Sequence, residues 1–544
     1  MKKSHAKLAM RSLAVSLTAL TGASVVVAAS WAQKAPSLPP YLAAFPEFAP
    51  RITPQMPGDV DIALKEKLEK NQQFPLVQRE FDLNAWQMFL SLQWPTNNQG
   101  QAAPTLTDTA FGEPHWTLWH NSSTIFQTDG AKPAACGGGA LRAMALTRDM
   151  TKPVSKGLMA FSPAATAGTN PRSTRFLGVI SAVGELNVAK LEEISQAFSG
   201  PMIDQNGQFV FYEIMIDPNE VGYLCDNSLY NINGQVAFTK GGGKVDMPHG
   251  TPNADWSGSY ELKFAWKIIG PKDDASRFYT TPAVVMDQGP NGQPIERKVT
   301  VGLVGMHIGH KSETSPQWIW ATFEQVDNLA VDNVAHPNLN PSFFDPNCPI
   351  CTVDQQPQQG SNGAYPRVPT QAWRTIPIPP DKLHLNQEAQ AVLAKMGSIW
   401  QYYQLIDTQW PTGPRAKPAN PLGQLPDPIT NKSGGDPTPV YLTNITMETY
   451  FQGGNEPACN GMELPGNVNC PANPTTWTSP QNNKPPPIAQ ANSSNVFVSE
   501  SCMGCHSSAG VYTSYNPTTQ QGTTSGQLTG DFSWLLTQKA SWQQ

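Results

Sequence analysis

Five residues near the end of the chain, Cys502-Met503-Gly504-Cys505-His506, combine two thiols and an imidazole at a spacing with chemical meaning. Two thiols on one turn of backbone can each form a thioether with a vinyl group of a porphyrin. The histidine that follows at once can then bind the iron from one face. The pattern predicts one covalent haem c, attached through Cys502 and Cys505, with His506 as an axial ligand. The alternative to haem attachment is that the pattern arises by chance or forms half of a zinc site.

The sequence after His506 contains neither methionine nor histidine. A small, self-contained cytochrome c usually supplies its second axial ligand from that side of the motif. Here the sixth ligand must come from the body of the protein, or the iron is five-coordinate and open. Met447 and His307 are the two candidates for the sixth ligand. Less common ligand types after the motif are Tyr512, Tyr515 and Lys539.

His307 falls in a predicted strand from Val299 to His310. The two-residue period of a strand predicts that its side chain shares a face with Val301 and Leu303, with Met306 and His310 on the other face. A lone strand histidine is often a hydrogen-bonded structural residue, and a methionine such as Met447 is often a packing residue. Both candidates therefore keep a structural alternative.

The first part of the chain has the pattern of an export signal. Lys and Arg residues precede an apolar run, and small residues near Ala32 suit cleavage, so residues 1–32 are predicted to be a signal peptide. Its removal takes four basic and no acidic residues, which moves the formal charge from −6 to −10. An acidic chain without a dense Lys/Arg cluster argues against nucleic acid as a partner. We expect a periplasmic or secreted protein without an integral membrane segment after cleavage.

Six cysteines remain outside the haem motif. In an exported protein they can form disulfides, because the compartment outside the cytoplasm is oxidising. Six thiols allow fifteen pairings. Proximity in sequence favours one set, which pairs Cys348 with Cys351, Cys459 with Cys470, and Cys136 with Cys225. Thr352 follows Cys351, so the sequence Cys348-Pro349-Ile350-Cys351 is not a second haem motif. A structural disulfide is the preferred interpretation of that sequence, over a redox dithiol.

Hydrophobic periodicity predicts an α+β fold in which a mainly antiparallel sheet is flanked by helices. We predict helices over 59–71, from Asp82 to Pro95, over 185–198, and from Asn386 to Trp410. Strands are predicted over 209–216, 260–268, 299–310 and 318–324. The domain prediction comprises a signal peptide (1–32), a Pro-rich arm (33–57), an α+β body (58–440), a wrapping linker (441–493) and a C-terminal haem segment (494–544).

No catalytic triad, zinc-protease helix or convincing carboxylate pair is evident in the sequence. His115 and His120 flank two tryptophans. Their five-residue separation and loop surroundings favour a surface or structural role over a metal site.

Three phrases resemble a group of exported bacterial cytochrome c family proteins of undefined reaction. They are Val304–Lys311 (VGMHIGHK), Gln317–Glu324 (QWIWATFE) and the haem motif itself with Ser501 before it. The resemblance extends from about Asp82 onward. It implies a haem on Cys502 and Cys505 and an axial His506, and it implies no particular reaction. A di-haem peroxidase or rubber oxygenase would need a second attachment motif, which the sequence lacks.

Two functions of different class fit these observations. The first is a monohaem electron carrier with a redox partner protein, in which the body supplies the sixth ligand. The second is a peroxidase- or oxygenase-like haem oxidoreductase, with a pocket for a small-molecule substrate in the β-rich body. The size of the body favours the enzyme, and the lack of recognisable acid/base residues favours the carrier. The sequence leaves the substrate, redox partner, potential and oligomeric state open.

Overall fold

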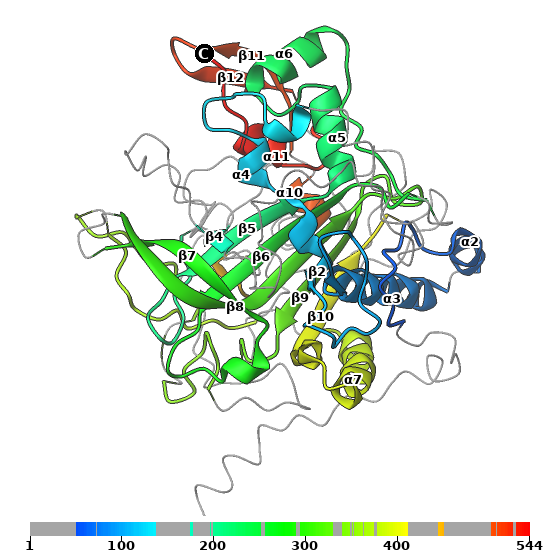
Figure 1. Cartoon of the computed structure of the whole chain (residues 1–544), viewed down its shortest axis with the longest axis vertical. Helices are drawn as coiled ribbons and strands as arrows, with labels where there is room; N and C mark the ends of the chain where they lie inside the picture. Colours follow the sequence, from blue (N-terminus) through cyan, green and yellow to red (C-terminus); the bar gives the residue numbers. More distant parts are fainter. Residues whose placement is uncertain are drawn as a thin grey trace, which may run out of the picture.

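The computed structural model describes most of the body and three stretches of the C-terminal haem segment. The described residues are 51–71, 73–137, 175–177, 196, 200–251, 256–289, 294–329, 340–348, 351, 353–362, 364–374, 378–411, 444–450, 502–506, 509–525 and 529–544. Within them, an antiparallel sheet lies at the centre and helices pack around it (Figure 1). The α+β prediction is therefore confirmed. The predicted signal peptide, most of the arm, nearly all of helix 185–198, the Cys459–Cys470 pair and most of the linker lie outside these residues.

The central sheet follows the order β10-β9-β8-β6-β5-β3, with β7 paired to β8 and the short β4 parallel to β7. The four predicted strands are all present in it, and β7 was not predicted. The bounds are β3 (His120–Asn121), β4 (Arg175–Leu177), β5 (Val210–Ile216), β6 (Tyr260–Ile268), β7 (Thr280–Gln288), β8 (Pro294–His310), β9 (Ile319–Gln325) and β10 (Tyr403–Gln409). A separate two-stranded pair joins β1 (Pro95–Thr96) to β2 (Glu113–Pro114).

A β-bulge in strand β8 changes which of its side chains point to each face of the sheet. Leu303 and Gly305 pair with consecutive residues of β6, so Val304 between them has no partner of its own. Such a β-bulge shifts the alternation of side chains by one residue. As a result Leu303, before the bulge, and Met306, after it, both belong to the same hydrophobic core.

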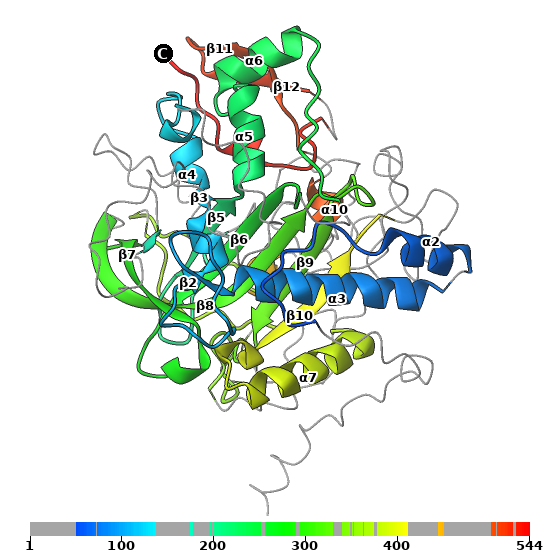
Figure 2. The same cartoon turned by 45° about the vertical axis from the view of Figure 1, so that its right-hand side comes forward.

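One face of the sheet is covered by helices α3 (Phe74–Leu92) and α7 (Pro380–Lys395), with α2 (Ile62–Lys70) beside α3. Figure 2 shows α3 lying across the strands and α7 next to β10. The core there is aromatic: the Phe89 ring stacks on Phe323 of β9 at 4.2 Å between centroids. Helix α3 begins well before Asp82. Asp82 is buried within the helix, and its carboxylate pairs with Lys382 of α7 at 2.8 Å.

The helix predicted from Asn386 to Trp410 is wrong beyond Lys395. Gly397 adopts a positive φ of 68°, a backbone conformation that ends helices and that glycine tolerates. A 3-10 turn (Ile399–Tyr402) follows, and the chain then enters β10, antiparallel to β9. The apolar period of that predicted helix would place Val392 on its inward face, but Val392 is 41% exposed. Leu385, Ala389 and Leu393 form the buried side of α7 instead.

Two helices inside the predicted strand region, α5 (Pro218–Asp226) and α6 (Ile232–Lys240), were not predicted. Together with the short α4 (Ser122–Ile125) they lie at one end of the sheet, with the C-terminal segment (Figure 1). That segment contains α10 (Cys502–His506), β11 (Tyr512–Asn516), β12 (Gln521–Thr524) and α11 (Leu535–Gln538). Gln235 of α6 holds it by accepting from the Tyr512 amide at 3.1 Å and donating to the Leu536 carbonyl at 2.8 Å.

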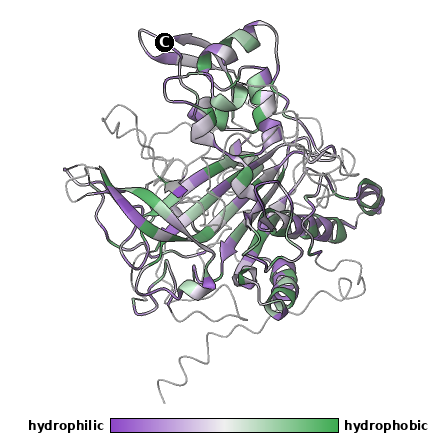
Figure 3. Ribbon diagram, viewed as in Figure 1, coloured by the Kyte–Doolittle hydropathy of each residue, from purple (hydrophilic) through white to green (hydrophobic). Residues whose placement is uncertain are grey.

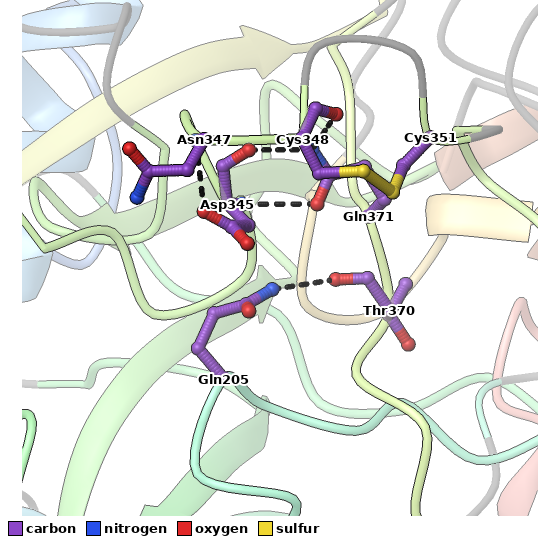
Figure 4. Close-up of a disulfide and its surroundings, with 7 residues drawn as sticks. All are labelled: Gln205, Asp345, Asn347, Cys348, Cys351, Thr370 and Gln371. Atoms are coloured by element: carbon purple, nitrogen blue, oxygen red, sulfur yellow. Dashed lines mark hydrogen bonds between the residues drawn. A yellow bond between two sulfur atoms is a disulfide. The ribbon is translucent and has the colours of Figure 1, made fainter.

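Two of the three predicted disulfides are confirmed. Cys136, which follows α4, is bonded to Cys225 of α5, and Cys348 and Cys351 close a short loop. Figure 4 shows the second disulfide, where the side chain of Gln371 bonds to both the amide and the carbonyl of Asp345, at 2.9 and 3.0 Å. These contacts support the structural interpretation of Cys348-Pro349-Ile350-Cys351.

Polar and apolar residues are mixed along the strands and the surrounding helices (Figure 3). Among the helices that the structure describes, none is both long enough and apolar enough to cross a membrane.

Candidate haem site

The haem motif forms the single helical turn α10, which is anchored to the sheet. Met503 is fully buried, and its amide donates to the Gln409 side chain at the end of β10 at 2.8 Å. Cys502 is partly buried and packs against the core that α5, α6 and the C-terminal segment share. Cys505 lies one helical turn further along α10. The turn therefore fixes the attachment motif against an edge strand of the body.

The orientation of His506 fits an axial ligand. Its Nδ1 lies 2.7 Å from the carbonyl oxygen of Phe532, and its ring lies 4.4 Å from the ring of Trp320 on β9. A carbonyl oxygen can only accept, so we assign the proton to Nδ1, which leaves the lone pair of Nε2 for a metal. A histidine ligand is commonly oriented in this way by a hydrogen bond on its other nitrogen.

The surroundings of His506 favour the neutral imidazole, which is the form that binds iron. Burial lowers its pKa to about 4, although the Phe532 hydrogen bond acts in the opposite direction. The nearby His307 and Lys263 side chains add smaller electrostatic effects that also lower the pKa. His307, one of the two predicted sixth ligands, is thus close enough to His506 to interact with it.

The face of β8 that carries His307 differs from the prediction. Because of the bulge at Val304, His307 lies on the opposite face from Leu303, not on the same face. Its cross-strand neighbours are Lys263 of β6 and Thr322 of β9. The bulge therefore places His307 on the side of the sheet away from α3 and α7.

A carboxylate holds His307 in place. Its Nε2 lies 2.8 Å from Oε1 of Glu448, and both side chains are largely buried, with 16% and 14% exposure. Its Nδ1 is buried and has no hydrogen-bond partner within the described structure. A carboxylate on one ring nitrogen and a free lone pair on the other is the usual environment of a metal-binding histidine. The unpartnered Nδ1 is the atom that iron would satisfy.

Glu448 belongs to a described segment, 444–450, that packs across β8 and β9. The Asn444 amide donates to Glu448 at 2.9 Å, and the Asn444 side chain donates to Thr322 at 2.8 Å. A Cβ at Gly305 would lie 2.1 Å from the Thr446 hydroxyl. The missing side chain of Gly305 therefore allows this segment to approach the sheet and to present Glu448 to His307.

Met447, the other predicted ligand, is fully buried in a different hydrophobic core. Its neighbours there include Val304 and Phe343, whereas Met503 and Trp320 belong to the core around α10. The structure thus brings His307, rather than Met447, toward His506.

Of the histidine pair near the Trp residues, His115 is buried and lies 3.4 Å from the Thr96 hydroxyl, which fits a structural role.

Three residues of this site were not predicted: Phe532, Lys263 and Glu448. The Phe532 carbonyl has no sequence signal, since any residue can supply a backbone oxygen. Lys263 alternates with buried apolar residues along β6, which could have placed it on the polar face. Glu448 directly follows Met447, so it belongs to a segment in which the sequence had already singled out a residue.

Comparison of the chain with models of protein families, with curated proteins and with solved structures finds no match. The geometry of the site therefore carries the functional argument.

Proposed function

We propose that this protein is an exported monohaem c-type cytochrome that transfers electrons. Cys502 and Cys505 would hold its haem, and His506 and His307 would bind the iron. Periplasmic or secreted location follows from the predicted signal peptide and from the oxidising conditions that haem attachment and disulfides require. The haem supplies a reversible one-electron couple. The partner in this proposal is a second redox protein.

One observation carries the proposal: two histidines near each other each have one ring nitrogen engaged and the other left for a metal. His506 is oriented by Phe532, and His307 by Glu448. The protein's own task is to hold both imidazoles in a fixed orientation. The Phe532 carbonyl would keep a proton on Nδ1 of His506, and the carboxylate of Glu448 would keep the proton of His307 on Nε2.

A second candidate, a haem oxidoreductase, is favoured by the same His307–Glu448 pair with Lys263 nearby. A histidine backed by a carboxylate is also a suitable acid/base group beside an open iron. Whether His307 binds the iron or stands off it distinguishes the two functions.

Absorption spectra of the purified holoprotein, with and without carbon monoxide, test this choice. The carrier proposal predicts a low-spin spectrum that carbon monoxide does not change. His307→Ala should become high-spin and bind carbon monoxide on reduction, while the matched control Met447→Leu should stay low-spin. A wild-type protein that is already high-spin and binds carbon monoxide would refute the carrier and support the oxidoreductase.

A further inference from the structure

A pair of acidic side chains lies where α5 meets β6 and the C-terminal segment. Glu220, in the first turn of α5, is fully buried, and neither of its carboxylate oxygens has a donor within the described residues. Oε1 of Glu261, on β6, is also buried and has no hydrogen-bond donor within the described residues. The two carboxyl groups lie within hydrogen-bond reach of each other. Two ionised carboxylates only accept, so this contact becomes a hydrogen bond only when one of them carries a proton.

Physical chemistry requires that proton. Burial and then the charge of Glu261 raise the pKa of Glu220 well above its usual value, and burial also raises the pKa of Glu261. Two carboxyl groups in contact in a low-dielectric site cannot both ionise near neutral pH, so they share one proton. The pair titrates as a unit rather than as two independent acids.

The pair is connected to the haem segment. Ser533 hydrogen-bonds to Glu261, and the preceding residue, Phe532, provides the carbonyl that orients His506. One side of the carboxyl pair therefore contacts the same short stretch of backbone that fixes the axial histidine. A change of charge at the iron would be felt at the pair across a poorly screened interior.

The other charged groups around the pair are already engaged. Asp217 caps α5 and accepts from the amides of Asn219, Glu220 and Tyr260. Asp531 forms an ion pair with Lys311, which also reaches the exposed Asp246. The charged groups that act directly on Glu220 and Glu261 are Asp217, the cap of α5, and Asp531 of the C-terminal segment. Around Asp531 lie Lys311 after β8 and Tyr223 of α5, and Asp246 in turn contacts Lys311.

We infer that Glu220 and Glu261 form a redox-linked proton site, which exchanges one proton with water as the haem changes oxidation state. This inference rests on the proposed electron-transfer function. The pair shares one proton while the protein is oxidised. When one electron arrives from a one-electron donor protein, the pair would take up a second proton from water, and it would release that proton when the electron leaves. Charge in the buried region is thereby kept constant. The protein would couple electron transfer to proton transfer.

Potentiometric titration of the full-length holoprotein between about pH 5 and about pH 9 tests the inference. Over the range where the pair titrates, the midpoint potential of the wild type should fall as pH rises, by up to about 59 mV for each tenfold change in proton concentration. Glu261→Gln and Glu220→Gln should each flatten this slope. Glu66→Gln, at an exposed position on α2, is the matched control and should leave it unchanged.

A second readout does not depend on the haem. The infrared carbonyl absorption of protonated carboxylic acids should have the same intensity near neutral pH in the wild type and in Glu66→Gln, and should be weaker in Glu220→Gln. A haem-loaded protein whose potential is independent of pH, or whose slope persists in both Gln variants, overturns the inference and leaves the electron-transfer proposal intact. A protein without covalent haem overturns the electron-transfer proposal, and the redox linkage with it.

Discussion

The contact of Lys311 with Asp531 offers a quantitative test of how the C-terminal segment depends on the body. Lys311 follows β8, and its Nζ lies 2.5 Å from Oδ2 of Asp531, whose side chain is fully buried. The Met247 amide donates to the same oxygen at 2.7 Å. Lys311 also pairs with Asp246, whose side chain is 82% exposed. Lys311→Met would therefore remove the cation from one buried and one exposed carboxylate.

The magnitude follows from the difference in burial. Removing one partner of a buried ion pair leaves an uncompensated charge and costs about 3–5 kcal/mol. An exposed pair such as that with Asp246 contributes about 0–1 kcal/mol, because water screens it. At about 1.4 kcal/mol for each factor of ten, Lys311→Met should raise the population of the opened C-terminal segment by about a hundredfold or more. The matched control Asp246→Asn should raise it less than about fivefold.

Hydrogen exchange measured on peptides from residues 529–544 reports this local opening directly. We expect strong loss of protection in Lys311→Met, confined to the C-terminal segment and the neighbouring ends of α5 and α6. Equal exchange in Lys311→Met and wild type would refute the claim that the body holds this segment through the buried pair. Equal effects of Lys311→Met and Asp246→Asn would refute the reasoning from burial.

Three further predictions concern the sixth ligand, the disulfides and pH. Glu448→Ala should convert part of the holoprotein to a high-spin form in absorption spectra, because His307 loses its orienting carboxylate, whereas Glu448→Gln, which keeps an acceptor, should stay mostly low-spin. Replacing Cys136 and Cys225 by Ser should lower the free energy of unfolding, measured in urea, by about 4–5 kcal/mol, because that disulfide joins residues 89 positions apart. Replacing Cys348 and Cys351 by Ser should lower it by only about 2 kcal/mol, because those residues are 3 positions apart. Burial raises the pKa of Glu80 from 4.5 to about 7, so the folded state favours its protonated form and stability falls as pH rises through that range. Thermal melts of Glu80→Gln should show less of this fall, and an unchanged pH profile would contradict the assignment.

The fold class was predictable because periodicity is a local property of the sequence. The four predicted strands carry β-branched and aromatic residues, and they occur in the sheet. The failures have local causes too. The apolar pattern after Lys395 suits a helix, but Gly397 stops it, and β10 gains the edge of β9 as a partner. A partner strand far away in sequence decides such a segment, and a periodicity argument does not include it.

The site was partly predictable for a similar reason. The haem motif and the choice of His307 depend on residue types, which the sequence displays. Residue types do not reveal on which face of the sheet His307 lies. Val304 has no partner residue on β6, and this bulge reverses the alternation of side chains from which the face of His307 was predicted. The groups that orient the two histidines, the Phe532 carbonyl and the Glu448 carboxylate, come from separate segments that only the tertiary structure brings to them.

The central claim is that one haem is covalently attached at α10. Intact-protein mass spectrometry after denaturation and acid extraction of free haem tests it most directly. The protein should be produced in a host that exports it and attaches haem to a reference c-type cytochrome in the same experiment. We predict a mass increase of one haem, which Cys502→Ser with Cys505→Ser abolishes and Cys348→Ser with Cys351→Ser leaves in place. An exported wild-type chain with no added mass, beside a fully loaded reference protein, would contradict the claim.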